Sequence, residues 1–256
     1  MGEQPVVITR VAQRHWHALE DDRVVGRGEA SRRSDGRIFL SIDAWRDAVF
    51  DQLADAVLAD LPAPLYTVVD EADLDLMSGW QRAGFTTRRR EWEYLVPTDP
   101  RVTGLGSVPP PPGVTMMPAG AARPGPLRQV YDTIRAEVET SVGWQAMPGE
   151  LQVRPEATAV LDPLRYAVAA ESDRYVGLVR VAARRGQARI GLVAVLADRR
   201  RRGIARGLLA HALDSLHRRG IETATAEVDE GNGPATALFE GVGARRASSN
   251  LELVWR

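Results

Sequence analysis

The chain has 256 residues, of which 44% are hydrophobic and 26% are charged, and its net charge at pH 7 is −1. This composition is typical of a globular protein with one large or two small domains, and the near-neutral charge gives no general attraction to nucleic acid. Cysteine is absent, which excludes disulfides, cysteine-based zinc sites and a cysteine nucleophile.

The first half of the chain predicts short strands and two helices. A helix over residues 44–60 is expected to begin at Asp43 as N-cap and to end before Pro62 and Pro64. Its predicted apolar stripe consists of Trp45, Val49, Leu53 and Val57. A second, short helix is expected to end over residues 80–84. The predicted strands lie at residues 6–12, 16–20, 23–30, 65–69 and 91–96, with a hairpin turn at Asp21-Asp22.

Residues 97–113 are rich in proline and glycine, which favours an extended linker over a packed element. We therefore expect two domains, over residues 1–98 and 114–256, joined by a linker at 99–113. In the second half, helices are expected over residues 126–138 and 234–240, with a polar segment at 139–155. The predicted strands lie at residues 114–117, 165–170, 174–182, 223–228 and 250–255.

The second half is organised around residues 191–209, where an apolar strand leads into a cationic loop and then into a helix that ends at Gly220. The first N–H groups of a helix have no intrahelical acceptor, and the helix dipole places positive charge there. Gly203 allows the backbone to approach a ligand closely, and the arginines at 199–202 supply charge-assisted donors. This pattern predicts a binding site for a pyrophosphate group.

The same loop resembles a family signature. Arg200-x-x-Gly203-x-Ala205 matches the Q/R-x-x-G-x-G/A pattern of the GCN5-related N-acetyltransferases (GNATs), and Val195-x-Ala197 stands where that family has V-x-P. A second motif lies further along the chain, Asn232-x-x-Ala235-x-x-Leu238-Phe239-x-x-x-Gly243-Ala244. It resembles the family's pattern N-x-x-A-x-x-L-Y-x-x-x-G-F. The resemblance implies an α/β (α+β) fold with a mixed sheet, acetyl-CoA as cosubstrate, and direct acetyl transfer to an amine.

The resemblance also implies how acetyl-CoA is held. Backbone amides of the central strand bind the pantetheine arm as an added strand would, and the loop binds the pyrophosphate. Gly191 is a candidate for the bulge that opens this strand, with close packing as the alternative. The arginine run could otherwise be a solvated face or a nucleic-acid patch, but its position between strand and helix favours the cofactor. The predicted cofactor contacts are Val193, Ala194, Val195, Arg200, Arg201, Arg202, Gly203, Ile204, Ala205, Arg206, Asn232 and Phe239, with helix capping as the alternative for Asn232.

Glu227 is the first candidate for the general base. It lies twelve residues before Phe239, a spacing similar to that of the base glutamate and acid tyrosine in ribosomal-protein N-terminal acetyltransferases of this family. The alternative is a solvent-facing carboxylate on a strand. Phe239 departs from the pattern because it has no proton to give, but a thiol with a pKa near 8.5 leaves readily as thiolate, with water or Tyr175 assisting. Weaker base candidates are Glu137, Glu139 and Glu171.

The two halves resemble each other. Residues 18–26 align with 169–177 at a shift of 151, and residues 69–84 align with 228–243 at a shift of 159. The first half has Ser41-Ile42-Asp43-Ala44 where the second has its arginine-rich turn, and an acidic helix start repels phosphate. We therefore expect a tandem chain whose truncated first copy is degenerate and structural.

Alternatives to an acetyltransferase remain open. A non-catalytic acyl-CoA-binding or regulatory module would also carry the cofactor loop, and a mycothiol-synthase-like enzyme is a specific alternative among acetyltransferases. The expected acceptor is a small-molecule or peptide amine; Trp144 and Met147 are candidates to line its pocket, with core packing as the alternative. His15 and His17 lack carboxylates at ligand spacing, so no metal site is expected. We expect a cytoplasmic protein without membrane segments, and the oligomeric state is not predicted.

Overall fold

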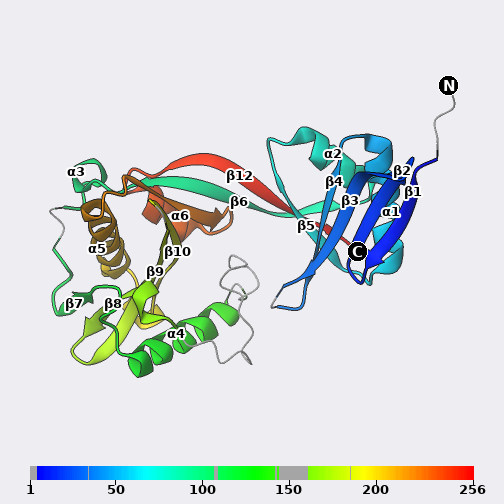
Figure 1. Cartoon of the computed structure of the whole chain (residues 1–256). Coiled ribbons are helices and arrows are strands. Elements are labelled where there is room, and N and C mark those ends of the chain that lie inside the picture. Colours follow the sequence, from blue (N-terminus) through cyan, green and yellow to red (C-terminus); the bar gives the residue numbers. More distant parts are fainter. Residues whose placement is uncertain (1–4, 34, 107–108, 142, 144–160, 185) are drawn as a thin grey trace. The chain divides into compact units, whose positions relative to one another are not determined.

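The computed structural model describes residues 5–33, 35–106, 109–141, 143, 161–184 and 186–256, and it divides into two compact units. The first unit comprises Met1–Glu91 with Ser248–Arg256, and the second comprises Trp92–Ala247. Two long strands, β6 (Thr86–Pro97) and β12 (Arg245–Trp255), contribute residues to both units (Figure 1). The predicted mixed α/β fold is confirmed.

The first unit is a sheet with two helices. Its strands follow the order β1-β2-β3-β4-β5-β12. The pairs β1–β2, β2–β3, β3–β4 and β5–β12 are antiparallel, and the pair β4–β5 is parallel. The predicted turn between β2 and β3 is present, and Asp21 and Asp22 both have positive φ there. The elements are β1 (Val7–Ala12), β2 (His15–Glu20), β3 (Arg23–Arg32), β4 (Ile38–Ala44), α1 (Asp47–Asp60), β5 (Leu65–Asp70) and α2 (Leu74–Arg82).

The start of helix α1 differs from the prediction. Asp43 is not an N-cap, because it lies in strand β4 opposite Arg27 of β3. The segment Ile38–Ala44 pairs with β3 along its whole length, and these ladder hydrogen bonds outweigh the local capping signal of Asp43. The helix begins at Asp47, and the predicted stripe is wrong for Trp45, which precedes the helix and is 96% exposed. The other three predicted stripe residues are buried.

The second unit is a sheet covered by a helix on each face. Its strands follow the order β6-β11-β10-β9-β8-β7, in which β10 and β11 are parallel. The elements are α3 (Pro100–Thr103), β7 (Val114–Met117), α4 (Pro124–Glu139), β8 (Tyr166–Glu171), β9 (Arg174–Arg184), β10 (Gln187–Val195), α5 (Ile204–Arg218), β11 (Thr223–Asp229) and α6 (Gly233–Glu240). Among the described residues, no helix is both long and apolar enough to cross a membrane.

Side-chain alternation shows which helix covers which face of the second sheet. A Cβ added to Gly177 of β9 would meet Leu208 of α5, so Gly177 faces α5. Tyr166 of β8, which lies opposite Arg180 of β9, stacks edge-on against Tyr131 of α4. Positions 177 and 180 point to opposite faces because side chains alternate along a strand. Helices α4 and α5 therefore cover opposite faces, as Figure 1 shows.

The segment predicted as an extended linker is partly packed. Helix α3 lies within it, and Thr98, Thr103 and Leu105 are buried in the second unit. Thr98 donates its hydroxyl to the backbone oxygen of Ile221, at 2.5 Å. The prediction of an unpacked segment is wrong here, since polar and apolar side chains between the prolines find partners that composition does not reveal.

The turns after β5 and β11 are built alike. In the first, the Asp70 carboxylate accepts the N–H of Ala72, and the Asp73 side chain caps α2 by accepting the N–H of Leu76. In the second, the corresponding acceptors are Asp229, which binds the N–H of Gly231, and Asn232, which binds that of Ala235. All four positions are related by the shift of 159 residues found in the sequence.

Candidate functional site

The central strand of the second unit carries a bulge at Gly191. The register between β9 and β10 shifts between Ile190 and Leu192, so Gly191 is the extra residue. The parallel pairing with β11 covers residues 188–190 only and ends at the pair Ile190–Ala226. Beyond that pair, β10 is paired with β9 alone in the part of the chain that the structure describes. The predicted cofactor residues Val193, Ala194 and Val195 lie on this open stretch.

The turn after β10 exposes a set of backbone donors. Arg201 has a φ of 63° and Gly203 a φ of 81°, which turns the chain sharply into the first residue of α5, Ile204. Gly207 is the first residue of this region whose N–H bonds back into the turn, to the oxygen of Gly203 at 2.9 Å. Among the described residues, no acceptor is bonded to the N–H groups of residues 201–206. The helix dipole adds partial positive charge at the same point.

The arginines of this turn divide into two groups. Arg199 binds Glu171 at 2.8 Å, and this bond together with nearby Asp198 raises the pKa of the Arg199 guanidinium. Arg200 donates to the backbone oxygen of Val195 at 3.2 Å. The remaining three are exposed and have no ion-pair partner among the described residues: Arg201, Arg202 and Arg206. The first group fixes the turn, and the second group is available to an anion.

Glu137 holds the start of the turn in place. Its two carboxylate oxygens lie 2.9 and 3.1 Å from the N–H of Ala197, and one of them lies 3.2 Å from Arg200. Glu137 was a weaker candidate for the base, and so was Glu171, which binds Arg199. Both carboxylates are engaged in shaping the turn, which gives them a structural role that the sequence did not reveal.

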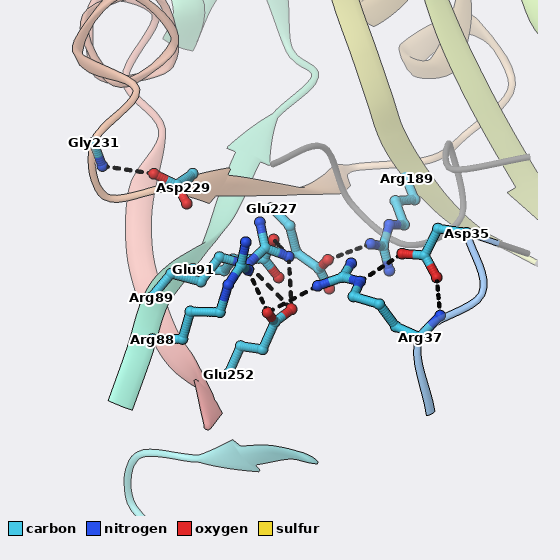
Figure 2. A network of polar contacts seen from close by, with 10 residues as sticks. All are labelled: Asp35, Arg37, Arg88, Arg89, Glu91, Arg189, Glu227, Asp229, Gly231 and Glu252. Carbon is cyan, nitrogen blue, oxygen red and sulfur yellow. Dashed lines mark hydrogen bonds and ion pairs between the residues drawn. The ribbon is translucent and has the colours of Figure 1, made fainter. Parts of the chain in front are cut away.

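Glu227 lies just beyond the point where β10 and β11 separate. It follows Ala226, and its side chain is 23% exposed. One carboxylate oxygen accepts a hydrogen bond from Nη2 of Arg189 on β10 at 2.5 Å, as Figure 2 shows. Alternation along β11 turns the two side chains away from the face that packs against α5. Glu227 is thus a half-buried carboxylate beside an opened strand pair, held by an ion pair with Arg189.

Three other predicted residues have structural partners within the second unit. Phe239 is buried and stacks on Tyr94 with ring centroids 6.0 Å apart. Asn232 caps α6, which is the alternative that the sequence left open for it. Tyr175 is buried, and its hydroxyl accepts the N–H of Arg123 next to the first turn of α4, at 3.0 Å. The hydroxyl of Tyr175 therefore lies beside the start of α4.

The face covered by α4 carries two buried tyrosines. Burial raises the pKa of Tyr166 to about 12, with the neighbouring Tyr131 adding to the rise and Arg180 opposing it. Burial also raises the pKa of Tyr131. Both hydroxyls stay protonated at neutral pH. Sequence reasoning missed this pair and Arg189, because only the strand register brings them to the face that carries Glu227.

The remaining predictions concern the acceptor pocket and metal binding. Trp144 and Met147, the candidates for an acceptor pocket, lie in the part of the chain that is not described. His15 approaches Glu29 to 3.8 Å. Within the described ranges, no three histidine, aspartate or glutamate side chains come together in a way that could hold a metal ion.

The second unit is similar to acetyltransferases, a class of enzyme that takes its acetyl group from acetyl-CoA. Residues 131–244 match the family described as "Acetyltransferase (GNAT) family". The matched residues lie within the second unit and make up less than half of the chain.

Known relatives match over different lengths. The chain is 28% identical to a mycothiol acetyltransferase from Clavibacter michiganensis subsp. michiganensis over 242 residues, covering 91% of this chain and 76% of the relative. It is 41% identical over 56 residues to the [ribosomal protein bS18]-alanine N-acetyltransferase of Escherichia coli K12, covering 22% of this chain and 38% of the relative.

Solved structures are similar in fold. A tandem GNAT protein from the clavulanic acid biosynthesis pathway aligns with a TM-score of 0.68 and 13% identity, covering 94% of this chain and 82% of that one. A GCN5-related N-acetyltransferase from Sphaerobacter thermophilus aligns with a TM-score of 0.66 and 16% identity, covering 96% and 82%.

Proposed function

We propose that the second unit binds the pyrophosphate of acetyl-CoA on the backbone amides of residues 201–206 and the pantetheine arm along Val193–Val195. The open amides carry this proposal, because an anion is the ligand that a row of unpaired N–H groups at a helix start accepts best. Arg201, Arg202 and Arg206 add charge-assisted donors around the same point. Isothermal titration of the chain with CoA tests the proposal, and a ligand that binds without contacting this turn would refute it.

The proposed chemistry needs few groups. Glu227 takes a proton from the acceptor amine, and Arg189 holds the carboxylate in position. A backbone amide of the opened strand polarises the acetyl carbonyl as charge develops on its oxygen. The leaving thiol departs as thiolate without a tyrosine acid, since its ordinary pKa of about 8.5 makes it a good leaving group. Phe239 then serves packing alone.

A non-catalytic acyl-CoA-binding module is the competing proposal, and the absence of a tyrosine at position 239 favours it. The two functions differ in one measurement. A catalyst releases free thiol from acetyl-CoA when an amine panel is added, whereas a binding module retains CoA affinity and releases none. The panel should include an aminoglycoside, a polyamine, an amino acid and a peptide with a free N-terminus.

The acceptor proposed first is the amine of a small-thiol precursor. The mycothiol acetyltransferase named above matches more than nine-tenths of this chain, and a second, from Clavibacter sepedonicus, is 29% identical over 249 residues. A peptide N-terminus is the alternative, favoured by the shorter match to the bS18-alanine acetyltransferase. Parallel assays with the amine of a small-thiol precursor and an alanine-initiated peptide distinguish the two acceptors.

The first unit is proposed to be a degenerate copy of the same domain. In the first unit, strands β3 and β4 pair from Gly26–Ala44 to Ala30–Leu40 without a bulge. The corresponding pair in the second unit, β9 and β10, has the bulge at Gly191. Helix α1 has Asp47 in its first turn, where a carboxylate repels an anion. A chain altered only in the turn at residues 201–206 of the second unit tests this proposal. Any CoA that this chain still binds would have to occupy the first unit.

A further inference from the structure

We infer that the first unit holds a separate binding site for a small organic anion, in a pocket of about 350 Å³ at the carboxyl-terminal end of β12. The pocket is lined by Ala63, Pro64, Tyr66, Arg88, Val254 and Arg256. Its size falls at the lower end of the range for small-molecule sites. The inference does not rest on the function proposed for the second unit.

The pocket's position follows from the strand register. Val254 of β12 lies opposite Tyr66 of β5, so the two side chains stand together on one face of the sheet. The hydroxyl of Thr86 on β6 lies 3.4 Å from the oxygen of Val254, which brings the start of β6 to the same place. Arg88 follows two residues later on that strand. Both helices of the first unit pack on the other face, where Thr67 and Leu253 are buried.

Both charged side chains of the lining are cationic. Arg88 uses Nη1 to bind Glu252, and its other nitrogens have no acceptor among the described residues. Arg256 is exposed and has no hydrogen-bond or ion-pair partner in the described part of the chain. Two guanidinium groups with open donors favour an oxyanion, that is, a carboxylate or a phosphate.

The region behind the pocket has a surplus of positive charge. Glu252 is 3% exposed and binds Arg37, Arg88 and Arg89, as Figure 2 shows. In addition, Asp35 binds Arg37, and Glu91 binds Arg89. Burial and the positive charges of Arg37 and Arg89 lower the pKa of a further arginine, Arg33, although Glu252 and Asp35 oppose this. Four arginines thus face three carboxylates, and the field at the pocket attracts an anion.

The rest of the lining suits an apolar or aromatic body. Tyr66 stacks on Phe39 with centroids 5.4 Å apart, which holds its ring in place. Pro64 and Val254 add apolar surface beside it. The ligand class that fits is therefore an oxyanion attached to a compact apolar or aromatic group, with the oxyanion between Arg88 and Arg256 and the body against Tyr66.

The test is isothermal titration of the full chain with phenyl phosphate, benzoate and inorganic phosphate at low ionic strength. A Gly203→Asp background keeps phosphate away from the turn at residues 201–206. We expect one equivalent of phenyl phosphate or benzoate to bind more tightly than inorganic phosphate, and the tighter of the two identifies the anionic group. Arg256→Gln should weaken binding at least tenfold.

Three further variants complete the test. Arg88→Gln should weaken binding as Arg256→Gln does, while Arg23→Gln, an exposed arginine elsewhere in the first unit, should leave it unchanged. Tyr66→Leu should reduce affinity for phenyl phosphate to that for inorganic phosphate. Arg256→Gln leaves the Glu252 contacts intact, so a folding defect would not explain its effect. Absence of binding, or equal affinity in the parent and in both pocket arginine variants, would overturn the inference.

Discussion

Replacing Gly203 by aspartate should weaken CoA binding strongly and leave the fold intact. The substitution places a carboxylate at the first turn of α5, beside the open amides. Gly203 has a φ of 81°, and a Cβ added there would lie 3.7 Å from Cγ of Pro111, an ordinary van der Waals contact. Aspartate and asparagine tolerate this left-handed conformation better than other residues, so the cost to folding is about 1 kcal/mol for either.

The magnitude follows from Coulomb's law. Two unit charges about 5 Å apart repel by about 3 kcal/mol at an effective dielectric constant of about 20. Because the turn is exposed and salt screens the repulsion, we expect an effect of about 2 to 3 kcal/mol. Each factor of ten in affinity corresponds to about 1.4 kcal/mol. The affinity for CoA should therefore fall by a factor of about 30 to 100.

Isothermal titration with CoA measures this loss, and Gly203→Asn is the matched control. Asparagine has the same shape and the same backbone tolerance but no charge, so it should retain affinity to within about tenfold. Circular dichroism and thermal unfolding verify that both variants fold. If aspartate and asparagine reduce the affinity equally, the effect is steric, and the turn is not the place where the pyrophosphate binds.

Three other predictions concern catalysis and stability. Glu227→Gln should lower kcat/KM by a factor of about 10² to 10⁴ if the carboxylate is the base. Arg189→Gln should lower kcat/KM by a smaller factor. Equal losses of kcat/KM in the two variants would mean that the carboxylate serves only the ion pair. Since the pKa of Tyr166 is raised to about 12, the folded chain keeps a proton that the unfolded chain loses near pH 10, so the free energy of unfolding should fall by about 2 to 3 kcal/mol between pH 10 and 12. Urea unfolding at several pH values measures this, and Tyr166→Phe should reduce the slope, while Tyr131 keeps its own contribution. Glu252→Gln should lower the free energy of unfolding by about 3 to 5 kcal/mol, because three arginines lose their common partner. The control is the exposed Glu29→Gln, which should leave the urea midpoint unchanged. An unchanged midpoint in Glu252→Gln would show that the network does not stabilise the fold.

The parts predicted well from the sequence are those whose signals are local. The turn at Asp21-Asp22, the strand leading into residues 197–203 and the helix that follows are each specified by residues within one or two turns of the chain. Gly191 lies at the bulge expected of it, since a strand glycine often marks one. The family followed from two such local motifs in the right order.

The parts that were missed depend on distant partners. The sequence places a capping residue at Asp43, yet strand β4 extends through it because β3 lies alongside. Arg189 becomes the partner of Glu227 only through the parallel register of β10 and β11, 38 residues apart in sequence. Glu137 reaches Ala197 from another helix, 60 residues away. No spacing rule connects such pairs, so the roles of these residues could not be predicted.

Strand β12 links the folding of the first unit to the synthesis of the second. Residues 248–256 belong to that unit, and Leu251 and Leu253 are buried in its core opposite strand β5. These residues leave the ribosome after the entire acetyltransferase unit has been made. The amino-terminal half of the nascent chain must therefore wait for its last strand, and while it waits β5 has an unpaired edge for a chaperone or a neighbouring nascent chain to bind.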